Sequence, residues 1–434
     1  MTKGRVGYIY SHQHFVGELA EVNTPKGSEY HFSYAASYLA KGLAPIGFHL
    51  PLTTEPYIRN SLPPFFANLM SEGWVKRHQA RRARLDQDDK FGLLLGHGAE
   101  LIGPLSIVTA FQGNELTTPG RALPSPVRKL DGYSINFARA EFNDVAFESL
   151  DKASISGVQP KMFLKVMPKK HGLSLTNAVG MGPYIVKPSP AGLPELAENE
   201  YMIMRLCKRV GFDVADHHLV PFSCGELAYV TGRFDLERKG KRPEFIEDMA
   251  SALDVAPGNK SDDSLSYERT LIAAHQLCGG HAQVLIMGFR QVVMAYIVGN
   301  NDMHLKNLAL LRPMDSLTAT GFTKVYDMLS VAPYRLYDRA GYLSLCLLEA
   351  EATDSEFTSS YEHYGYYTRH DFIQLAKKIG LGEKLGDKLI SQLCEKVGRA
   401  AEDVILKSPG SDALKHVILE RIKERLKVLR QPAF

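Results

Sequence analysis

The sequence is poor in cysteine, in long apolar runs and in any excess of one charge, and each shortage excludes a class of protein. Its five cysteines are an odd number, and no two of them have the CxxC spacing of a zinc or redox motif. They are Cys207, Cys224, Cys278, Cys346 and Cys394. We therefore expect free thiols in a reducing compartment and no disulfide scaffold.

No stretch of the sequence has the character of a signal peptide or a membrane span. The first residues, MTKGRVGYIYSHQHF, lack a continuous apolar segment, and the apolar stretch 282–298 contains Gln283, Arg290 and Gln291. That stretch is better explained as a buried core helix. The sequence therefore predicts a cytoplasmic protein that does not contact a membrane.

The charges nearly cancel, since 51 Lys and Arg residues face 48 Asp and Glu residues, for a net charge of +3. A field that would attract nucleic acid to the whole surface is therefore excluded. Two local basic segments remain, 76–84 and 414–430. We expect each to be the solvated face of a helix, with phosphate contact as the alternative. The basic face of the second holds Lys415, Arg421, Lys423, Arg425, Lys427 and Arg430.

The hydrophobic pattern divides the chain into three predicted parts, 1–110, 125–255 and 256–434. The first has short β-like runs, including the alternating stretch Tyr30–Tyr34, and reads as a small α+β unit. The second contains predicted strands at 163–166, 184–187, 219–221 and 227–230, with a helix at 194–211 between the second and third. That order is typical of a nucleotide-binding small lobe. The third is helical, with a buried helix at 285–298 and three amphipathic helices within 366–430.

The segment 300–307, NNDMHLKN, follows the predicted buried helix and carries Asp302 and Asn307 in a D-x-x-x-x-N spacing. Phosphoryl transfer needs a carboxylate beside the attacking hydroxyl and an oxygen ligand for Mg²⁺ slightly further along the loop. Asp327 ends a second short predicted strand and is a candidate metal ligand. Each residue alone could equally be a turn residue, but their order after a buried helix favours a kinase.

Two further features suit a nucleotide site. Lys187 ends an apolar predicted strand, and a lysine there can hold phosphates and pair with a glutamate of the next helix. Of Glu198 and Glu200, we prefer Glu200, because its apolar neighbours indicate an inward face. The segment Ser154–Lys161, SISGVQPK, is a Gly/Ser turn whose backbone amides could cradle phosphate, although an ordinary turn is the alternative.

Together these motifs resemble the HipA family of bacterial serine/threonine protein kinases, which act as toxins of toxin–antitoxin pairs. They are SxxGxQxK at 154–161, Lys187, Arg233–Asp235, Asn301–Asn307 and Tyr326-Asp327. Segments 30–34, 45–52 and 66–73 resemble that family's N-terminal subdomain. The resemblance therefore covers nearly the whole chain.

The resemblance implies a mixed α+β, protein-kinase-like fold of two lobes. A small N-terminal α/β subdomain would precede the small lobe, and the C-terminal lobe would be all-helical. ATP and Mg²⁺ would be the cofactors. Asp302 would be the catalytic base, Lys306 would contact the transferred phosphoryl group, and His304 would hold the loop, with direct catalysis as its alternative role. Asn307 and Asp327 would bind the metal.

The resemblance also implies a nucleotide site and a modification site. Residues 229–234 would form the hinge that faces adenine, and the first serine of the Gly-rich motif, Ser154, would be an autophosphorylation site that shuts the enzyme off. Ser156 is a second candidate phosphosite. Residues expected to contact the nucleotide are Ser156, Gly157, Val158, Gln159, Lys161, Lys187, Glu200, Gly232, Arg233, Phe234 and Tyr326. Gly232 and Met303 depart from the family's usual residues.

The implied function is a protein kinase toxin that phosphorylates a bacterial protein, such as glutamyl-tRNA synthetase, and arrests growth. Its partner would be a HipB-like helix-turn-helix antitoxin, through which it would reach operator DNA. Two alternatives stay open: a non-catalytic co-repressor that binds the antitoxin, and a small-molecule kinase of the aminoglycoside-phosphotransferase type.

Overall fold

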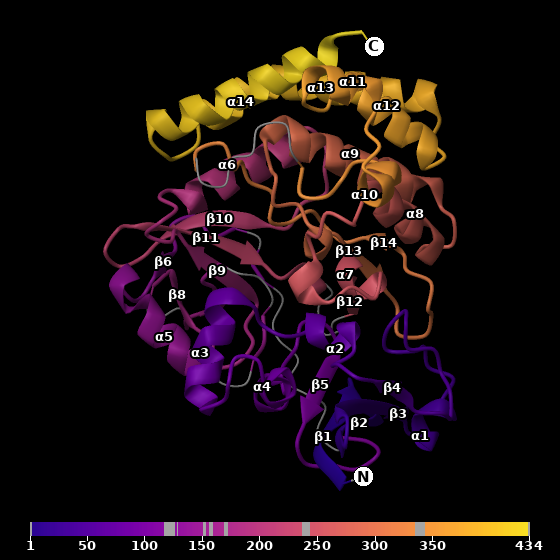
Figure 1. Cartoon of the computed structure of the whole chain (residues 1–434). Helices are drawn as coiled ribbons and strands as arrows, with labels where there is room; N and C mark the ends of the chain where they lie inside the picture. The colour runs from indigo at the N-terminus through magenta and orange to yellow at the C-terminus, as the bar shows by residue number, and fades with distance from the viewer. Residues whose placement is uncertain are drawn as a thin grey trace. The chain divides into compact units, whose positions relative to one another are not determined.

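The computed structural model describes residues 2–116, 126–127, 129–150, 153–155, 159–168, 172–236, 244–334 and 343–432. The chain divides into two compact units, whose elements are labelled in Figure 1. Unit 1 comprises Met1–Pro190, Asp216–Pro257 and Arg312–Leu317; unit 2 comprises Ala191–Ala215, Gly258–Leu311 and Thr318–Phe434. The domain boundaries expected from the sequence stay a prediction.

The first sheet of unit 1 has five antiparallel strands in the order β4-β3-β2-β1-β5. Its strands are β1 (Thr2–Ser11), β2 (His14–Thr24), β3 (Gly27–Tyr34), β4 (Tyr57–Arg59) and β5 (Leu105–Val108). The helices of this region are α1 (Ala36–Leu39), α2 (Pro64–Asn68), α3 (Gly73–Ala83) and α4 (Lys90–His97). Alternation at Tyr30–Tyr34 is confirmed, because Phe32 and Tyr34 are buried on β3.

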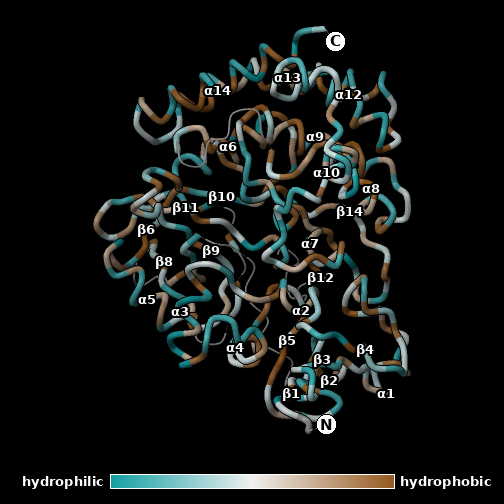
Figure 2. The backbone as a smooth tube through the Cα atoms, in the orientation of Figure 1, coloured by the Kyte–Doolittle hydropathy of each residue, from teal (hydrophilic) through white to brown (hydrophobic). Residues whose placement is uncertain are grey.

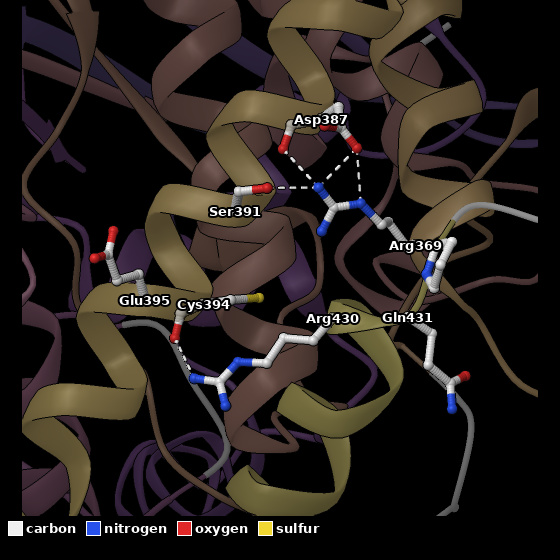
Figure 3. A pocket seen from close by; sticks show the side chains of 8 residues that line it. Arg369, Asp387, Ser391, Cys394, Glu395, Arg430 and Gln431 are labelled. Carbon is white, nitrogen blue, oxygen red and sulfur yellow. Dashed lines mark hydrogen bonds and ion pairs between the residues drawn. The ribbon is translucent and has the colours of Figure 1, made fainter.

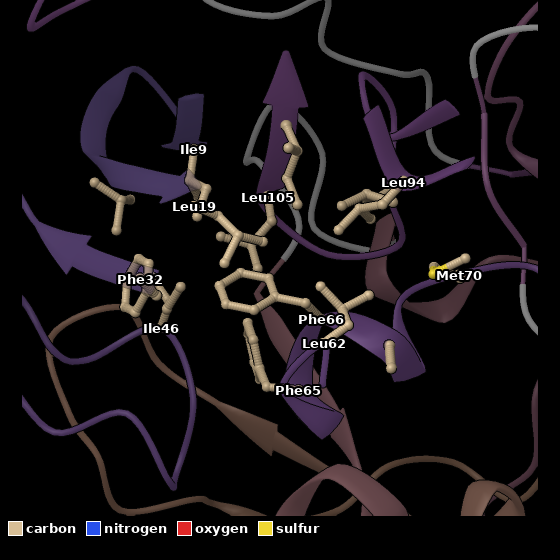
Figure 4. Close-up of a cluster of buried hydrophobic side chains, with 14 of the residues drawn as sticks. Ile9, Leu19, Phe32, Ile46, Leu62, Phe65, Phe66, Met70, Leu94 and Leu105 are labelled. Carbon is tan, nitrogen blue, oxygen red and sulfur yellow. The ribbon is translucent and has the colours of Figure 1, made fainter. Parts of the chain in front are cut away.

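Apolar side chains from this sheet and its helices form one core, shown in Figure 4. The rings of Phe32 on β3 and Phe66 on α2 lie 5.3 Å apart, edge to face. Ile9, Leu19 and Phe66 are fully buried. Each such side chain contributes roughly 1.5–3 kcal/mol through its removal from water. This core includes Met70, which lies in the short connection between α2 and α3.

The second sheet of unit 1 has six strands in the order β10-β11-β9-β7-β8-β6. They are β6 (Ser134–Ile135), β7 (Met162–Val166), β8 (Ser174–Asn177), β9 (Tyr184–Pro188), β10 (His217–Pro221) and β11 (Leu227–Gly232). The short helices η1 (Arg139–Glu141) and α5 (Phe142–Ser149) precede β7. All four predicted strands are confirmed, but β8 lies between the first two of them, where the sequence analysis predicts no strand.

A fully buried arginine, Arg312, organises another part of unit 1. Its guanidinium donates to the carbonyls of Pro45 and Ile46 at 2.8 and 2.9 Å and lies 4.0 Å from the carboxylate of Glu247. Glu247 also accepts from the backbone amide of Phe48 at 3.2 Å. Burial raises the pKa of Glu247 to about 7, and the nearby Arg312 opposes that rise. The network therefore fastens segment 45–48 to β12 (Phe245–Asp248), which is followed by α7 (Met249–Ala252).

Unit 2 is built mainly from helices. They are α6 (Leu196–Arg209), α8 (Tyr267–Leu277), α9 (Ala282–Val298), α10 (Glu349–Asp354), α11 (Ser359–Tyr364), α12 (Arg369–Lys378), α13 (Glu383–Leu406) and α14 (Asp412–Arg430). The chain also has short 3-10 turns: η3 (Phe234–Leu236) belongs to unit 1, η5 (Leu305–Asn307) belongs to unit 2, and η4 (Pro257–Asn259) begins with the last residue of a unit 1 segment and continues in unit 2. The C-terminal part is not purely helical, since β13 (Ala309–Arg312) and β14 (Gly321–Phe322) pair through Leu310 and Phe322.

The amphipathic pattern of α14 is confirmed with one correction. Figure 2 shows hydrophobic and hydrophilic residues alternating along this helix, and its apolar residues Leu414, Ile418, Ile422, Leu426 and Leu429 are buried. Arg425, however, does not face solvent as expected. It is buried, its guanidinium lies 4.4 Å from the centre of the Tyr296 ring on α9, and it donates to the Tyr296 hydroxyl at 2.7 Å. The aliphatic stem of an arginine can pack in a core when its head finds such a partner.

All five cysteines are free thiols, as expected. Cys207, Cys278 and Cys394 are buried, Cys346 is half-buried, and Cys224 is exposed between β10 and β11. Among the described residues, no helix combines the length and the apolar composition that crossing a bilayer requires.

Candidate active site

The Asp302 loop begins where α9 ends. Gly299 adopts the left-handed conformation, with φ of 69°, which glycine enters without steric cost. The amides of Gly299 and Asn300 then bond back to the carbonyls of Tyr296 and Ala295, at 3.2 and 2.8 Å. This turn ends the buried helix sharply and projects the polar segment 300–307 away from it.

Hydrogen bonds within the loop fix the backbone of Asp302 from both sides. Its amide donates to the side-chain oxygen of Asn300 at 3.0 Å. Its carbonyl accepts from the amide of His304 at 2.9 Å and from Nδ2 of Asn307 at 3.0 Å. The residue itself is exposed. Because the Asn307 nitrogen points at Asp302, the Asn307 carbonyl oxygen is the atom that could bind a cation.

The middle of the loop is anchored in the interior of unit 2. His304 and Lys306 are 8% and 7% exposed, and the hydroxyl of Tyr267 on α8 donates to the Met303 carbonyl at 2.6 Å. Burial raises the pKa of Tyr267, which keeps this donor protonated. Buried anchors beside an exposed carboxylate are what a preorganised catalytic loop needs.

Asp327 lies between two residues that bond to this loop. The Tyr326 hydroxyl donates to the Lys306 carbonyl at 2.8 Å, and Nδ2 of Asn300 lies 3.2 Å from the sulfur of Met328. The prediction that a strand ends at Asp327 is wrong. Only an isolated parallel bridge, Val214 with Val325, occurs there, and Asp327 has a φ of 57°. Such a conformation ends extended pairing, and aspartate is one of the side chains that tolerate it.

Helix α6 is tied to the segment that follows Asp327. Fully buried Asn199 donates to the Ser330 carbonyl at 2.8 Å and accepts from the Ser330 amide at 2.9 Å. Glu200, the next residue, is also fully buried, which agrees with the inward face preferred from the sequence. The sequence analysis missed Asn199. A polar residue among the apolar positions of an amphipathic helix was the available signal.

Lys187 lies in the middle of the second sheet of unit 1, on β9 between β7 and β11. It is 6% exposed, pairs in register with Tyr229, and its ammonium lies 5.4 Å from the centre of that ring. In chain order β9 is the third of the strands β7, β8 and β9, of which β7 pairs antiparallel with both others, and α6 follows β9 in the chain. Protein kinases place their phosphate-binding lysine on a third strand and its glutamate on the next helix.

The Gly-rich motif precedes β7. Ser156, Gly157 and Val158 lie outside the described residues. Lys161 is 5% exposed. The side-chain nitrogen of Gln159 is buried, and no acceptor for it occurs among the residues that the structure describes. A buried donor in that position suits a ligand oxygen.

The predicted hinge begins at the end of β11. The Gly232 amide donates to the Asp216 carbonyl at 2.8 Å, and the Arg233 amide to the Pro183 carbonyl at 2.9 Å. The Arg233 side chain is buried and forms a 2.5 Å ion pair with Asp235. That guanidinium is therefore already engaged by a carboxylate.

The predicted site residues thus fall into two sets. Unit 1 holds Ser154, Gln159, Lys161, Lys187, Gly232, Arg233 and Phe234; unit 2 holds Glu200, Asp302, His304, Lys306, Asn307, Tyr326 and Asp327. The described residues contain no group of three His, Cys, Asp or Glu side chains placed to hold a metal. An amide and a carboxylate nevertheless fit Mg²⁺, which takes one or two protein ligands together with substrate phosphates.

A cavity of about 540 Å³ lies elsewhere, among α12, α13 and the end of α14 (Figure 3). It is lined by Arg369, Asp387, Ser391, Cys394, Glu395, Arg430, Gln431 and Pro432. Arg369 donates to Asp387 at 2.7 Å, and Arg430 donates to the Cys394 carbonyl at 3.2 Å. The arginines therefore hold the helices together, and none of the predicted site residues lies in this cavity.

Known proteins resemble this chain along most of its length. Residues 8–108 match the HipA N-terminal domain, and residues 153–401 match the HipA-like C-terminal domain. A putative kinase of Haemophilus influenzae is 32% identical over 68% of this chain and 86% of its own length. The putative kinase Y4dM of Sinorhizobium fredii is 29% identical over 75% of this chain and 72% of its own.

A solved structure confirms the mixed α+β fold. HipA of Shewanella oneidensis MR-1, determined in complex with HipB and operator DNA, covers 97% of both chains with a TM-score of 0.71 at 19% identity. At that identity the similarity establishes the fold alone. The matches to the HipA N-terminal domain and to the HipA-like C-terminal domain together cover most of the chain. The chain therefore belongs to the HipA family.

Proposed function

We propose that this chain is an ATP- and Mg²⁺-dependent serine/threonine protein kinase that serves as the toxin of a toxin–antitoxin pair. The observation that carries the proposal is the geometry around Asp302. An exposed carboxylate stands on a loop with a fixed backbone, and hydrogen bonds join that loop to the residues on both sides of Asp327. A phosphoryl transferase needs a base and metal ligands held in this way.

In the proposed reaction, a serine or threonine hydroxyl attacks the γ-phosphorus of ATP. Asp302 takes the hydroxyl proton on its carboxylate as the new O–P bond forms and the bond to the β-phosphate oxygen breaks. Lys306, a buried cation on the same loop, stabilises negative charge on the transferred group, and His304 holds the loop. Mg²⁺, held by Asn307 and Asp327, would neutralise charge on the phosphates.

Residues of unit 1 would hold the nucleotide. Lys187 would contact the phosphates and pair with Glu200, as the strand-and-helix order suggests. The buried amide of Gln159, together with Lys161 and residues 156–158, would line the phosphates. The backbone at 232–234 would face adenine. Ser154, with Ser156 as the second candidate, would be the site of inactivating autophosphorylation.

The proposed partner is a HipB-like helix-turn-helix antitoxin. The support is the fold shared with a HipA whose structure contains HipB and operator DNA. Operator contact would then occur mainly through the antitoxin. The substrate would be a bacterial protein, and aminoacyl-tRNA synthetases are the first class to test, beginning with the glutamyl enzyme.

Mass spectrometry of purified protein incubated with ATP and Mg²⁺ tests the proposal. Wild type should gain phosphate on Ser154 or Ser156, and Asp302→Gln should gain none. Asp354→Asn, which changes an exposed aspartate at the end of α10, should behave as wild type. If the wild type binds a HipB-like antitoxin fully but phosphorylates nothing, the non-catalytic co-repressor is favoured. Rapid turnover of sugars or aminoglycosides would favour a small-molecule kinase.

A further inference from the structure

The segment that opens the Gly-rich motif is built into the N-terminal region of unit 1. Ala153 forms a parallel bridge with Glu100, and the Ser154 amide donates to the Glu100 carbonyl at 3.0 Å. Ser154 is 4% exposed. The hydroxyl proposed as a phosphate acceptor is therefore inaccessible in this conformation.

Ser71, at the junction between α2 and α3, holds that hydroxyl. The two Oγ atoms lie 3.0 Å apart, and the Ser154 hydroxyl donates to the Leu69 carbonyl at 3.1 Å. With its proton used there, Ser154 must accept from the hydroxyl of Ser71. Ser71 in turn accepts from the Ile155 amide at 3.1 Å. Each donor in this chain of bonds thus has an acceptor.

A second side chain supports the same segment from α3. Nε2 of Gln79 donates to the carbonyls of Ala153 and Leu150 at 2.9 and 3.3 Å, and both Ser71 and Gln79 are buried. Met70, labelled in Figure 4, precedes Ser71 and belongs to the N-terminal core. The contact is thereby joined to the packed core of the N-terminal region.

We propose that Ser71 is a positioning residue that holds residues 153–155 in this buried position, and that loss of its hydroxyl speeds the proposed phosphorylation of Ser154. The proposal rests on the proposed self-phosphorylation. Two physical facts support it: the small space beside Ser154 and the charge that a phosphate would bring there. The cavity beside Ser154 holds about 10 Å³, roughly the space of one water and too little for a phosphoryl group. A phosphate would also replace the donor to Leu69 with about −1.5 to −2 charges facing that carbonyl.

The buried position of Ser154 also limits the rate at which Ser154 can be phosphorylated. The Ser154 hydroxyl has to leave Ser71 and Leu69 before it can attack ATP, so its phosphorylation rate follows the fraction of molecules in which it has left them. The Ser71→Ala variant removes the hydroxyl that donates to Ser154 and accepts from Ile155. We expect a roughly fivefold faster phosphorylation of Ser154, which corresponds to about 1 kcal/mol.

The experiment uses the full chain in four forms: wild type, Ser71→Ala, Gln79→Leu and Ser251→Ala. Ser251 is the matched control, since it is a buried serine of unit 1 whose hydroxyl bonds to Glu247 at 2.8 Å, outside this network. Two quantities are measured. One is amide hydrogen exchange at Ser154 and Ile155 without nucleotide. The other is the initial rate of Ser154 phosphorylation with ATP and Mg²⁺, at temperatures where all four forms are folded.

Faster exchange and faster phosphorylation in both Ser71→Ala and Gln79→Leu, with Ser251→Ala unchanged, would support the proposal. Equal phosphorylation rates in wild type and Ser71→Ala would overturn it, although the kinase would stand. If no form gains phosphate, the kinase proposal fails instead, and exchange decides the role of Ser71. Faster exchange at Ile155 in Ser71→Ala then supports the positioning role, and unchanged exchange overturns it.

Discussion

The hydroxyl of Tyr326 donates a 2.8 Å hydrogen bond to the backbone carbonyl of Lys306. These two residues immediately precede the two proposed metal ligands, Asp327 and Asn307. The bond therefore fixes the spacing between two segments that are separated by about twenty residues in the chain. Deletion of one atom, the hydroxyl oxygen of Tyr326, is enough to remove this contact.

Tyr326→Phe should weaken use of the metal without unfolding the protein. One hydrogen bond contributes about 1 kcal/mol, so the Mg²⁺ concentration for half-maximal phosphorylation should rise about fivefold. Titration of initial rates with Mg²⁺ at saturating ATP measures this. Tyr364→Phe, on an exposed residue of α11, is the control. An unchanged Mg²⁺ requirement in Tyr326→Phe would show that this bond does not organise the metal ligands.

Lys187→Met should separate phosphate binding from adenine binding. The variant keeps the length of a buried side chain beside Tyr229 but removes its charge. A hydrogen bond to a charged group is worth about 1.5–3 kcal/mol, so ATP affinity should fall by roughly 10- to 100-fold. Adenosine affinity should stay within about twofold of wild type, because adenosine carries no phosphate.

Isothermal titration calorimetry with both ligands makes the comparison, and Lys165→Met on the exposed end of β7 is the control. Equal losses of ATP and adenosine affinity would mean that Lys187 supports the fold of the site and does not bind phosphate.

Arg312→Leu should strongly destabilise unit 1. The substitution leaves buried Glu247 without its neighbouring cation and removes the donors to Pro45 and Ile46. Removing one partner of a buried ion pair costs about 3–5 kcal/mol, whereas an exposed pair is worth up to about 1 kcal/mol. Arg59→Leu, which breaks the exposed pair with Asp254, should therefore change little.

Urea unfolding of both variants gives the two free energies, and the double variant Arg312→Leu, Glu247→Leu should recover part of the loss. Equal small effects in both single variants would contradict a stabilising role for the buried network.

Glu351→Gln should stabilise the protein more at higher pH. Burial raises the pKa of Glu351 to about 7, from 4.5 for an ordinary glutamate. Between those values the folded state binds more protons than the unfolded state, so the free energy of unfolding falls as pH rises. A glutamine keeps the acceptor for the Tyr367 hydroxyl and has no charge to bury.

The difference in Tm between Glu351→Gln and wild type should therefore grow as pH increases from about 5 to about 8. Glu356→Gln, on an exposed residue just beyond α10, should show no such trend. A difference in Tm that is constant with pH would mean that Glu351 titrates normally in the folded protein.

The helices and strands that could be predicted from the sequence are those made mostly of apolar residues. The buried helix α9 and the strands β7 and β9 were found because each is a mostly apolar run, and the length of the run separates a helix from a strand. Asp302 and Asn307 were proposed as site residues because the chemistry of phosphoryl transfer constrains their spacing along one loop. Both signals, an apolar run and a spacing of polar residues, lie within a short stretch of sequence, so a single sequence is enough to show them.

The missed features depend on partners that are distant in the chain. β8 has the polar sequence Ser174–Asn177 and forms a strand because β7 pairs with it. Arg425 is buried because Tyr296 lies opposite. Ser71 bonds to a residue 83 positions away, and neither local periodicity nor charge marks it. Asn199 bonds to a residue 131 positions away, and only its place among the apolar positions of α6 marks it.

The accessibility of the cysteines has a practical consequence. Cys224 is exposed on the turn that joins β10 to β11, while Cys207, Cys278 and Cys394 are buried and Cys346 is half-buried. A maleimide fluorophore should therefore label Cys224 first, without mutagenesis. β11 runs from that turn to the proposed adenine-facing backbone at Gly232. A dye at Cys224 would give an optical signal from the strand that leads to the nucleotide, suited to stopped-flow measurement of ligand entry.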